Sequence, residues 1–155
     1  MTADEATKVS EIVTSTIRSL NYYNVRAKEE EIRKYSPSEL LSSSREDADS
    51  VLLAKERQDI IGFCISKYDD GLIWLSWFGV EESHRKKGVG EQLLFSLEAT
   101  ATKRKAHKIW CDTRTVNLTA QRALQKAGYR QIATLKNHWY GQDFLLWEKI
   151  VDETA

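Results

Sequence analysis

Residues 80–94 are the most informative part of the sequence and read Val80-Glu81-Glu82-Ser83-His84-Arg85-Lys86-Lys87-Gly88-Val89-Gly90-Glu91-Gln92-Leu93-Leu94. The apolar run 72–80 before the loop predicts a strand, and residues 90–102 after it carry an apolar stripe at helical spacing. The loop between them holds three cations and two glycines. Glycines let backbone N–H groups approach a ligand, and a helix N-terminus offers unpaired donors and partial positive charge. Strand, loop and helix together predict a site for a phosphate or pyrophosphate.

The composition is that of a soluble globular protein. Of the 155 residues, 41% are hydrophobic and 30% charged, and 23 basic residues balance 23 acidic ones. With no net charge, no nucleic-acid partner is expected. The start of the chain, with Asp4 and Glu5, does not match a secretory signal, and no apolar run is long enough to span a bilayer, so no membrane partner is expected either. We expect a single cytoplasmic domain over residues 1–155.

The cysteines and histidines do not indicate a disulfide or a metal site. Cys64 and Cys111 lie in apolar strand-like runs, so both are expected to be buried free thiols of a reducing compartment. Together with the three histidines they show no metal-ligand spacing, so no metal is expected.

The pattern of apolar residues divides the chain into a helical segment, 1–50, and a sheet-rich segment, 51–155. Helices are predicted over residues 4–20, 27–35, 90–102 and 118–127, and Ser36, Pro37 and Glu39 predict a capping box that opens a further short helix, with loop composition over 42–50. Strands are predicted over 51–55, 60–68, 72–80, 108–113, 129–135 and 144–151.

Two features of the strands bear on the site. A helix connects strands 72–80 and 108–113, so these two are expected to run parallel. Gly79 lies inside its strand, where glycine marks a β-bulge or a close approach of backbone. The later helix is expected to be capped by Asn117 and to end at Gly128 in a left-handed conformation.

Other phosphate loops fit the sequence badly. A Walker loop needs Gly-Lys followed by Ser or Thr, and the dinucleotide fingerprint needs a third glycine where Leu93 stands. An ordinary solvated turn with basic residues is the structural alternative.

The residues around the loop carry a resemblance to a known family. The run 85–90, preceded by Trp77-Phe78-Gly79-Val80, and the pattern Asn117-x-x-Ala120 followed by Leu124 and Gly128-Tyr129 resemble the GNAT superfamily of N-acetyltransferases. The resemblance covers the last two-thirds of the chain, whereas the N-terminal helices match by position only and the family's first strand is short or missing. It implies an α+β fold of α/β/α layers: a mixed, mostly antiparallel central sheet with a splayed parallel strand pair and helices on both faces.

The resemblance also implies acetyl-CoA as co-substrate. The backbone of Phe78 and Val80, beyond a bulge at Gly79, would pair with the pantetheine arm like an added strand. The loop amides would hold the pyrophosphate, aided by cationic side chains, and Asn117 would contact the pantetheine. The cofactor-binding residues expected are Phe78, Gly79, Val80, Arg85, Lys86, Lys87, Gly88, Val89, Gly90 and Asn117.

The reaction implied is direct attack of a primary amine on the thioester in a ternary complex. The backbone N–H of Val80 is the expected oxyanion donor. The family's tyrosine acid falls at Leu124, and its glutamate base falls in a region that holds Trp74, Ser76 and Trp77, so neither role transfers. A non-catalytic acyl-CoA-binding sensor or interaction module is therefore the alternative function.

Other residues are candidates for proton transfer. Asp112 is the first candidate for the base and Tyr140 for the acid, with His138 and Asp143 as further candidates. Asp112 in a hydrogen-bonded turn, and His138 and Tyr140 as a cover of the hairpin, are the structural alternatives. Positioning of the reactants with ordered water is a further mechanism left open.

The acceptor is expected between the loop after the first helix and the final hairpin. The substrate-binding residues expected are Tyr22, Tyr23, Trp77, His138 and Asp143, with Trp139 and Tyr140 beside them. Aromatic rings beside carboxylates suit a cationic amine. The sequence leaves open whether that amine is a small molecule, a lysine or a protein N-terminus, and whether the aromatic C-terminal strand pairs in a homodimer.

Overall fold

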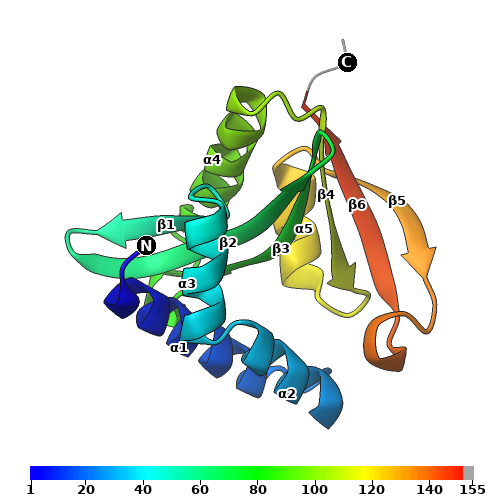
Figure 1. Cartoon of the computed structure of the whole chain (residues 1–155). Helices are drawn as coiled ribbons and strands as arrows, with labels where there is room; N and C mark the ends of the chain where they lie inside the picture. Colours follow the sequence, from blue (N-terminus) through cyan, green and yellow to red (C-terminus); the bar gives the residue numbers. More distant parts are fainter. Residues whose placement is uncertain (152–155) are drawn as a thin grey trace.

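The computed structural model describes residues 1–151. Within these residues, six strands form one mixed sheet in the order β1-β2-β3-β4-β6-β5, and helices cover both faces (Figure 1). The strands are β1 Val51–Glu56, β2 Asp59–Asp69, β3 Leu72–Val80, β4 Lys108–Arg114, β5 Arg130–Leu135 and β6 Phe144–Ile150. The helices are α1 Ala3–Ser19, α2 Val25–Lys34, α3 Pro37–Glu46, α4 Val89–Lys103 and α5 Leu118–Lys126, with short 3-10 helices η1 Glu82–His84 and η2 Trp139–Gly141. The predicted α+β class and element order are confirmed.

Side-chain caps begin the first two helices. In a complete capping box before α1, the Glu5 N–H donates to Thr2 Oγ1 at 3.2 Å and the Thr2 N–H donates to the Glu5 carboxylate at 2.7 Å. Before α2, the Ala27 N–H donates to Asn24 Oδ1 at 2.9 Å. Because these side chains occupy orphan N–H groups, each helix starts at a defined residue.

The third helix differs from the prediction in two respects. The Glu39 N–H donates to Ser36 Oγ at 3.5 Å and Pro37 is the first helical residue, but within residues 1–151 Glu39 does not return a bond to the Ser36 backbone, so the predicted capping box is only half formed. The helix also continues to Glu46, and the predicted loop over 42–50 is wrong for its first half. Ser42 Oγ donates to the Glu46 carboxylate at 3.3 Å, which satisfies polar side chains within a helical turn.

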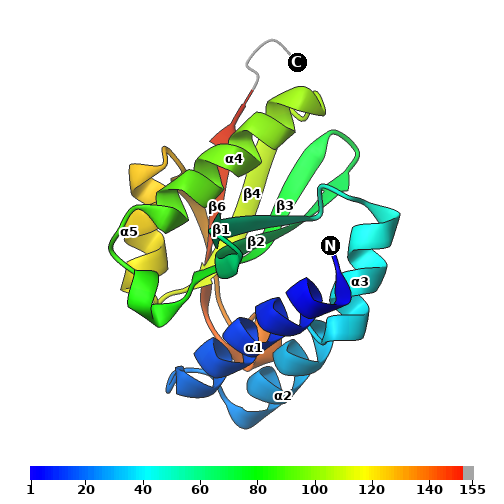
Figure 2. The same ribbon diagram turned by 90° about the vertical axis from the view of Figure 1, so that its left-hand side faces the viewer.

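Two hydrophobic cores lie on opposite faces of the sheet. Figure 2 shows the helices that cover these faces. One packs α4 and α5 against the sheet through Leu93, Leu97, Leu124 and Trp147. The other packs α1 and α3 against β1 and β2 through Val9, Val13, Leu40, Phe63 and Ile65. Cys64 and Cys111 are buried free thiols, as predicted. No helix within residues 1–151 is long and apolar enough to cross a membrane.

The parallel strands separate part-way along their length. β3 and β4 pair only from Leu72↔Lys108 to Trp74↔Trp110, whereas β3 continues beside β2 as far as Val80. The predicted parallel, splayed pair is therefore confirmed. Within residues 1–151, the splay leaves one edge of β3 without a neighbouring strand beyond Trp74.

The bulge on β3 lies at Ser76, and its prediction at Gly79 was wrong. The β2–β3 register passes from Ile65↔Trp77 to Ser66↔Leu75, so Ser76 is the extra residue. Gly79 stays in register with Phe63 on β2, and a Cβ added there would lie 2.9 Å from the Phe63 ring. A close approach is therefore present at Gly79, but the approaching group is the Phe63 side chain and not a neighbouring backbone.

Candidate active site

A cavity of about 210 Å³ opens where β3 and β4 part, with α2 and η2 contributing to its wall. Aromatic side chains form much of the lining: Tyr23, Tyr35, Trp74, Trp77, Trp139 and Tyr140. Two carboxylates, those of Glu31 and Asp112, also line it. The cavity therefore combines cation-binding rings with negative charge.

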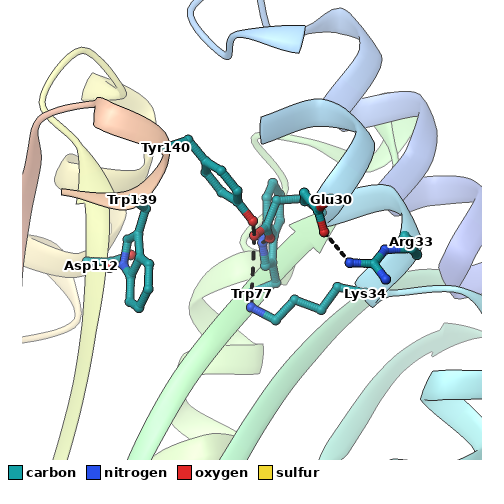
Figure 3. A network of polar contacts seen from close by, with 8 residues as sticks. Glu30, Arg33, Lys34, Trp77, Asp112, Trp139 and Tyr140 are labelled. Atoms are coloured by element: carbon teal, nitrogen blue, oxygen red, sulfur yellow. Dashed lines mark hydrogen bonds and ion pairs between the residues drawn. The ribbon is translucent and has the colours of Figure 1, made fainter. Parts of the chain in front are cut away.

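Glu31 is a buried carboxylate that sequence reasoning missed. Its residue is 9% exposed, Trp77 Nε1 donates to Oε2 at 3.0 Å, and the Tyr140 hydroxyl donates to Oε1 at 3.0 Å. Lys34 Nζ lies 3.9 Å from Oε1, at the edge of hydrogen-bonding contact. Figure 3 shows Tyr140 reaching from the hairpin toward α2 and Trp77.

The spacing on α2 contained a signal for Glu31. Ala27, Glu31 and Tyr35 follow at i, i+4 and i+8, and all three are buried. A lone glutamate on the buried stripe of an otherwise charged helix indicates a carboxylate that faces the interior.

Asp112 faces the cavity because successive side chains of β4 point to opposite faces of the sheet. Cys111 and Thr113 are buried on the α4–α5 side, so Asp112 points to the other face. Trp139 Nε1 donates to its Oδ2 at 2.6 Å (Figure 3). Burial raises the pKa of Asp112 above its usual value, and the charge of Glu31 adds to this rise, while the Trp139 hydrogen bond opposes it. The raised proton affinity suits a general base.

Tyr140 bridges the hairpin and α2. Its backbone lies in the left-handed region, with φ of 55°, and its carbonyl accepts from Asn24 Nδ2 at 3.0 Å. Burial, followed by the charge and hydrogen bond of Glu31, raises the pKa of Tyr140 to about 12. The hydroxyl is thus a neutral donor held by Glu31, and it gives up a proton less readily than an ordinary tyrosine.

Arg114 ties the loop after α1 to the start of β6. Its residue is 9% exposed, its Nη1 donates to the Tyr22 carbonyl at 2.6 Å, and its Nε donates to the Asp143 carbonyl at 3.1 Å. Gln142 Nε2 also donates to the Tyr22 carbonyl, at 2.9 Å. The guanidinium lies 5.5 to 5.8 Å from the ring centres of Tyr22, Tyr23 and Phe144.

The predicted acceptor residues divide into two groups. Tyr23 and Trp77 line the cavity, whereas Tyr22, His138 and Asp143 do not. The His138 ring packs on Trp139 with centroids 4.5 Å apart. The Asp143 carboxylate accepts from the Asn137 N–H at 2.8 Å and pairs with Lys136 at 3.0 Å, which closes the hairpin. His138 and Asp143 therefore shape the loop that carries the aromatic wall.

The basic loop adjoins this cavity through β3. Lys86 and Gly88 have positive φ, 61° and 82°, and Gly88 is the N-cap residue of α4. The first amides of α4 have no intrahelical acceptor, and the side chains of Arg85, Lys86 and Lys87 are exposed. Such a turn of backbone N–H groups before a helix forms an anion-binding concavity.

The free edge of β3 presents backbone groups next to the loop. The Glu81 N–H donates to the Ile61 carbonyl at 2.9 Å, toward β2. Because successive residues of a strand alternate, the N–H and C=O of Phe78 and Val80 face the edge that β4 leaves. A Cβ on Gly90 would lie 3.8 and 3.9 Å from the Val80 and Phe78 side chains, so loop and edge are contiguous.

Asn117 caps α5 at the cavity wall. Its Oδ1 accepts from the Ala120 N–H at 3.2 Å, which confirms the predicted cap, and Gly128 ends the helix region with φ of 87°. Leu124, at the family's tyrosine position, has no exposed surface and belongs to the core. No proton donor therefore stands at position 124.

Family and structural comparisons agree with this geometry. Residues 15–129 match the model of the acetyltransferase (GNAT) family. The chain belongs to this family. No curated protein is significantly similar to it in sequence.

Three solved structures show the likeness in fold. The PaiA N-acetyltransferase of Thermoplasma acidophilum, in complex with coenzyme A, has 20% identity and a TM-score of 0.82 over 97% of this chain and 95% of that one. The ribosomal-protein-alanine N-acetyltransferase of Brucella melitensis has 19% identity and a TM-score of 0.78 over 97% and 96%. The putative acetyltransferase YncA of Salmonella typhimurium, with acetyl-CoA, has 18% identity and a TM-score of 0.77 over 100% and 93%.

Proposed function

We propose that this protein transfers an acetyl group from acetyl-CoA to a primary amine by direct attack in a ternary complex. One observation carries the proposal: the cavity that holds Asp112 opens beside the free edge of β3, and that edge leads to the basic loop before α4. A donor bound along the edge and an acceptor in the cavity would meet where the strands part.

The residues along the edge fit acetyl-CoA. The outward N–H and C=O of Phe78 and the N–H of Val80 suit an extended arm with its own amides, and the loop from Lys86 to Gly90 suits a pyrophosphate. The Val80 carbonyl accepts from Arg85 Nε at 3.1 Å, so the arm would replace this bond if it paired there. Arg85 and Lys87 each contribute about 0.3–1 kcal/mol as exposed charges. Val89 holds the loop by burying its side chain, and the absence of a side chain at Gly79 leaves room for the Phe63 ring. Within residues 1–151 the amide nitrogen of Asn117 has no protein partner, so it is available to the arm.

Asp112 is the base in this proposal. When bound, the donor supplies a thioester carbonyl as the electrophile. Trp139 holds Oδ2, while within the described chain Oδ1 has no hydrogen-bond partner and can accept a proton from the amine. The Val80 N–H faces the free edge and is the donor for the oxyanion.

Tyr140 is the acid candidate for the departing thiolate. Its hydroxyl donates to Glu31, so proton delivery requires that this bond be exchanged. Water at the open edge is the alternative proton source, and Tyr140→Phe separates the two by its effect on kcat.

A non-catalytic acyl-CoA-binding module is the second candidate. The observation that favours it is Leu124, which places an apolar, fully buried side chain where many relatives carry a tyrosine acid. A binder of this kind raises its melting temperature with acetyl-CoA but releases no CoA when amines are added.

The test is acetyl-CoA binding followed by turnover. A hundredfold excess of ligand over Kd stabilises the fold by about 2.7 kcal/mol, which corresponds to a rise in melting temperature of roughly 5–10 °C for a chain of this size. CoA release is then measured with a panel of amines, amino acids and peptides. Absence of a thermal shift at millimolar acetyl-CoA would refute the proposed function, and a shift without CoA release would favour the binding module.

A further inference from the structure

Two carboxylates lie on different walls of the acceptor cavity. Glu31 comes from α2, and Asp112 comes from β4 (Figure 3 shows Asp112 and Trp139 facing Tyr140 and Trp77). A base for the reacting amine needs only one carboxylate. The second is therefore not explained by amine acetylation as such.

We propose that the acceptor is a small linear diamine, in which Asp112 receives the reacting amine and Glu31 binds the second, protonated amine. The inference rests on the proposed acetylation of an amine and names the class of acceptor.

Glu31 lacks the partner that a buried carboxylate requires. Each of its oxygens accepts one hydrogen bond and keeps a lone pair, and its only cation within residues 1–151, Lys34, lies at 3.9 Å with a side chain that is 61% exposed. Burying a carboxylate is unfavourable unless a close, hydrogen-bonded cation compensates for lost hydration. A substrate ammonium group at Glu31 would supply that cation.

The wall around Glu31 suits a diamine in other respects. Trp77 and Tyr140 contact the carboxylate through their N–H and O–H groups, and the Tyr35 ring packs edge-on against Trp77 in the same cavity. Aromatic faces stabilise ammonium groups and pack against methylene chains. The cavity, at 210 Å³, is smaller than the roughly 300–1,000 Å³ of sites for drug-sized ligands. A short methylene chain between two amines fits both the aromatic lining and the small volume of the cavity.

The two cations of the cavity do not favour a zwitterionic acceptor. Arg114 already donates to two backbone carbonyls and lies against three aromatic rings, and Lys34 extends into solvent. A substrate carboxylate would have to compete with those carbonyls. An amino acid or a peptide N-terminus is the contrasting acceptor in the test below.

The positions of the carboxylates assign their roles. Asp112 follows Trp110, the last residue of β4 that pairs with β3, by two positions, so it stands where the strands part and the thioester is proposed to lie. Glu31 lies across the cavity on α2. Loss of Glu31 should therefore act mainly on the KM for a diamine, and loss of Asp112 on kcat.

The experiment compares 1,4-diaminobutane and 1,5-diaminopentane with butylamine and pentylamine, at saturating acetyl-CoA, with CoA release as the readout. Because a charge-assisted hydrogen bond contributes roughly 10- to 100-fold, we expect the kcat/KM of a diamine to exceed that of its monoamine by at least about tenfold. Glu31→Gln should bring this ratio close to one by raising the KM for the diamine. Glu30→Gln is the matched control, because Glu30 pairs with Arg33 on the outside of the same helix.

A second variant separates ligand binding from a structural role. Tyr140→Phe removes a hydrogen-bond donor to Glu31 but leaves the Glu31 carboxylate and its charge in place. The ratio of kcat/KM for diamine over monoamine should therefore persist. If Tyr140→Phe abolishes the ratio as Glu31→Gln does, Glu31 serves only to hold Tyr140 and the inference is wrong. Equal kcat/KM for diamines and monoamines, or a preference for an amino acid or peptide, also overturns it while leaving the proposed acetylation intact. Absence of CoA release with every amine instead refutes the proposed function.

Discussion

Alanine at Gly88 should destabilise the protein, while alanine two residues later should not. Gly88 has φ of 82° and a Cβ added to it would meet no atom within 4 Å, so the cost is conformational and not steric. An L-residue in the left-handed region costs about 1–2 kcal/mol. For a domain of this size, Gly88→Ala should therefore lower the melting temperature by roughly 2–8 °C.

Gly90→Ala is the control for this prediction. Gly90 lies in the first turn of α4 without a positive φ, and its Cβ would make ordinary contacts with Val80 and Phe78. Replacing a helical glycine by alanine stabilises by up to about 1 kcal/mol. The two variants should thus differ by about 1–3 kcal/mol, with opposite signs.

The assay is thermal and urea denaturation followed by circular dichroism without acetyl-CoA. Gly88→Asn extends the series, because asparagine tolerates the left-handed region better than alanine and should lose less stability. Equal shifts for Gly88→Ala and Gly90→Ala would refute the conformational argument. With acetyl-CoA added, Gly88→Glu should abolish the ligand-dependent shift, because it places negative charge where the pyrophosphate is proposed to bind.

The further predictions concern Asp112 and Arg114. Because burial raises the pKa of Asp112, the acid-side fall of kcat/KM should occur at a higher pH than an ordinary aspartate would give. Trp139→Phe should move this fall to a still higher pH, because it removes a hydrogen bond that lowers the pKa of Asp112. An unchanged pH profile in Trp139→Phe would contradict the assignment of Asp112 as the base. The charged Asp112 carboxylate destabilises the fold above the pKa that Asp112 has in the folded protein, and this cost disappears as the pH falls. Asp112→Asn should therefore melt at the same or a higher temperature than the unmodified protein at pH 7. Its kcat should drop about 10²- to 10⁴-fold. Arg114→Leu removes two hydrogen bonds to backbone carbonyls, each contributing about 1.5–3 kcal/mol. It should lower the free energy of unfolding, measured in urea, by about 3–5 kcal/mol. A loss under about 1 kcal/mol, similar to that of the exposed control Arg122→Leu, would show that the Arg114 hydrogen bonds do not stabilise the fold.

Several features of the fold could be predicted from short-range patterns. β3 spans the predicted residues, 72–80, because an apolar run bounded by a turn and a glycine loop is a local signal. The cap by Asn117 and the left-handed Gly128 also depend on neighbouring residues only. The parallel direction of β4 follows from the helix that precedes it. The bulge could not be placed in this way, because the register at Ser76 depends on pairing with β2.

The sequence by itself determined the class of the protein. It also carried the proposal for the donor side, because residues 78–90 are contiguous and their glycines, charges and helix start act through the local backbone. The acceptor side was decided only by tertiary structure. Glu31 meets Tyr140 across 109 positions, and Asp112 meets Trp139 across 27. The helical spacing on α2 places Glu31 on the buried stripe, but no periodicity encodes which polar side chains the fold brings together around it. Its place in the cavity was therefore missed, and His138 and Asp143 were expected in a cavity that they do not line. Burial then sets the proton affinity of Asp112, because desolvation depends on what packs around the carboxylate in three dimensions.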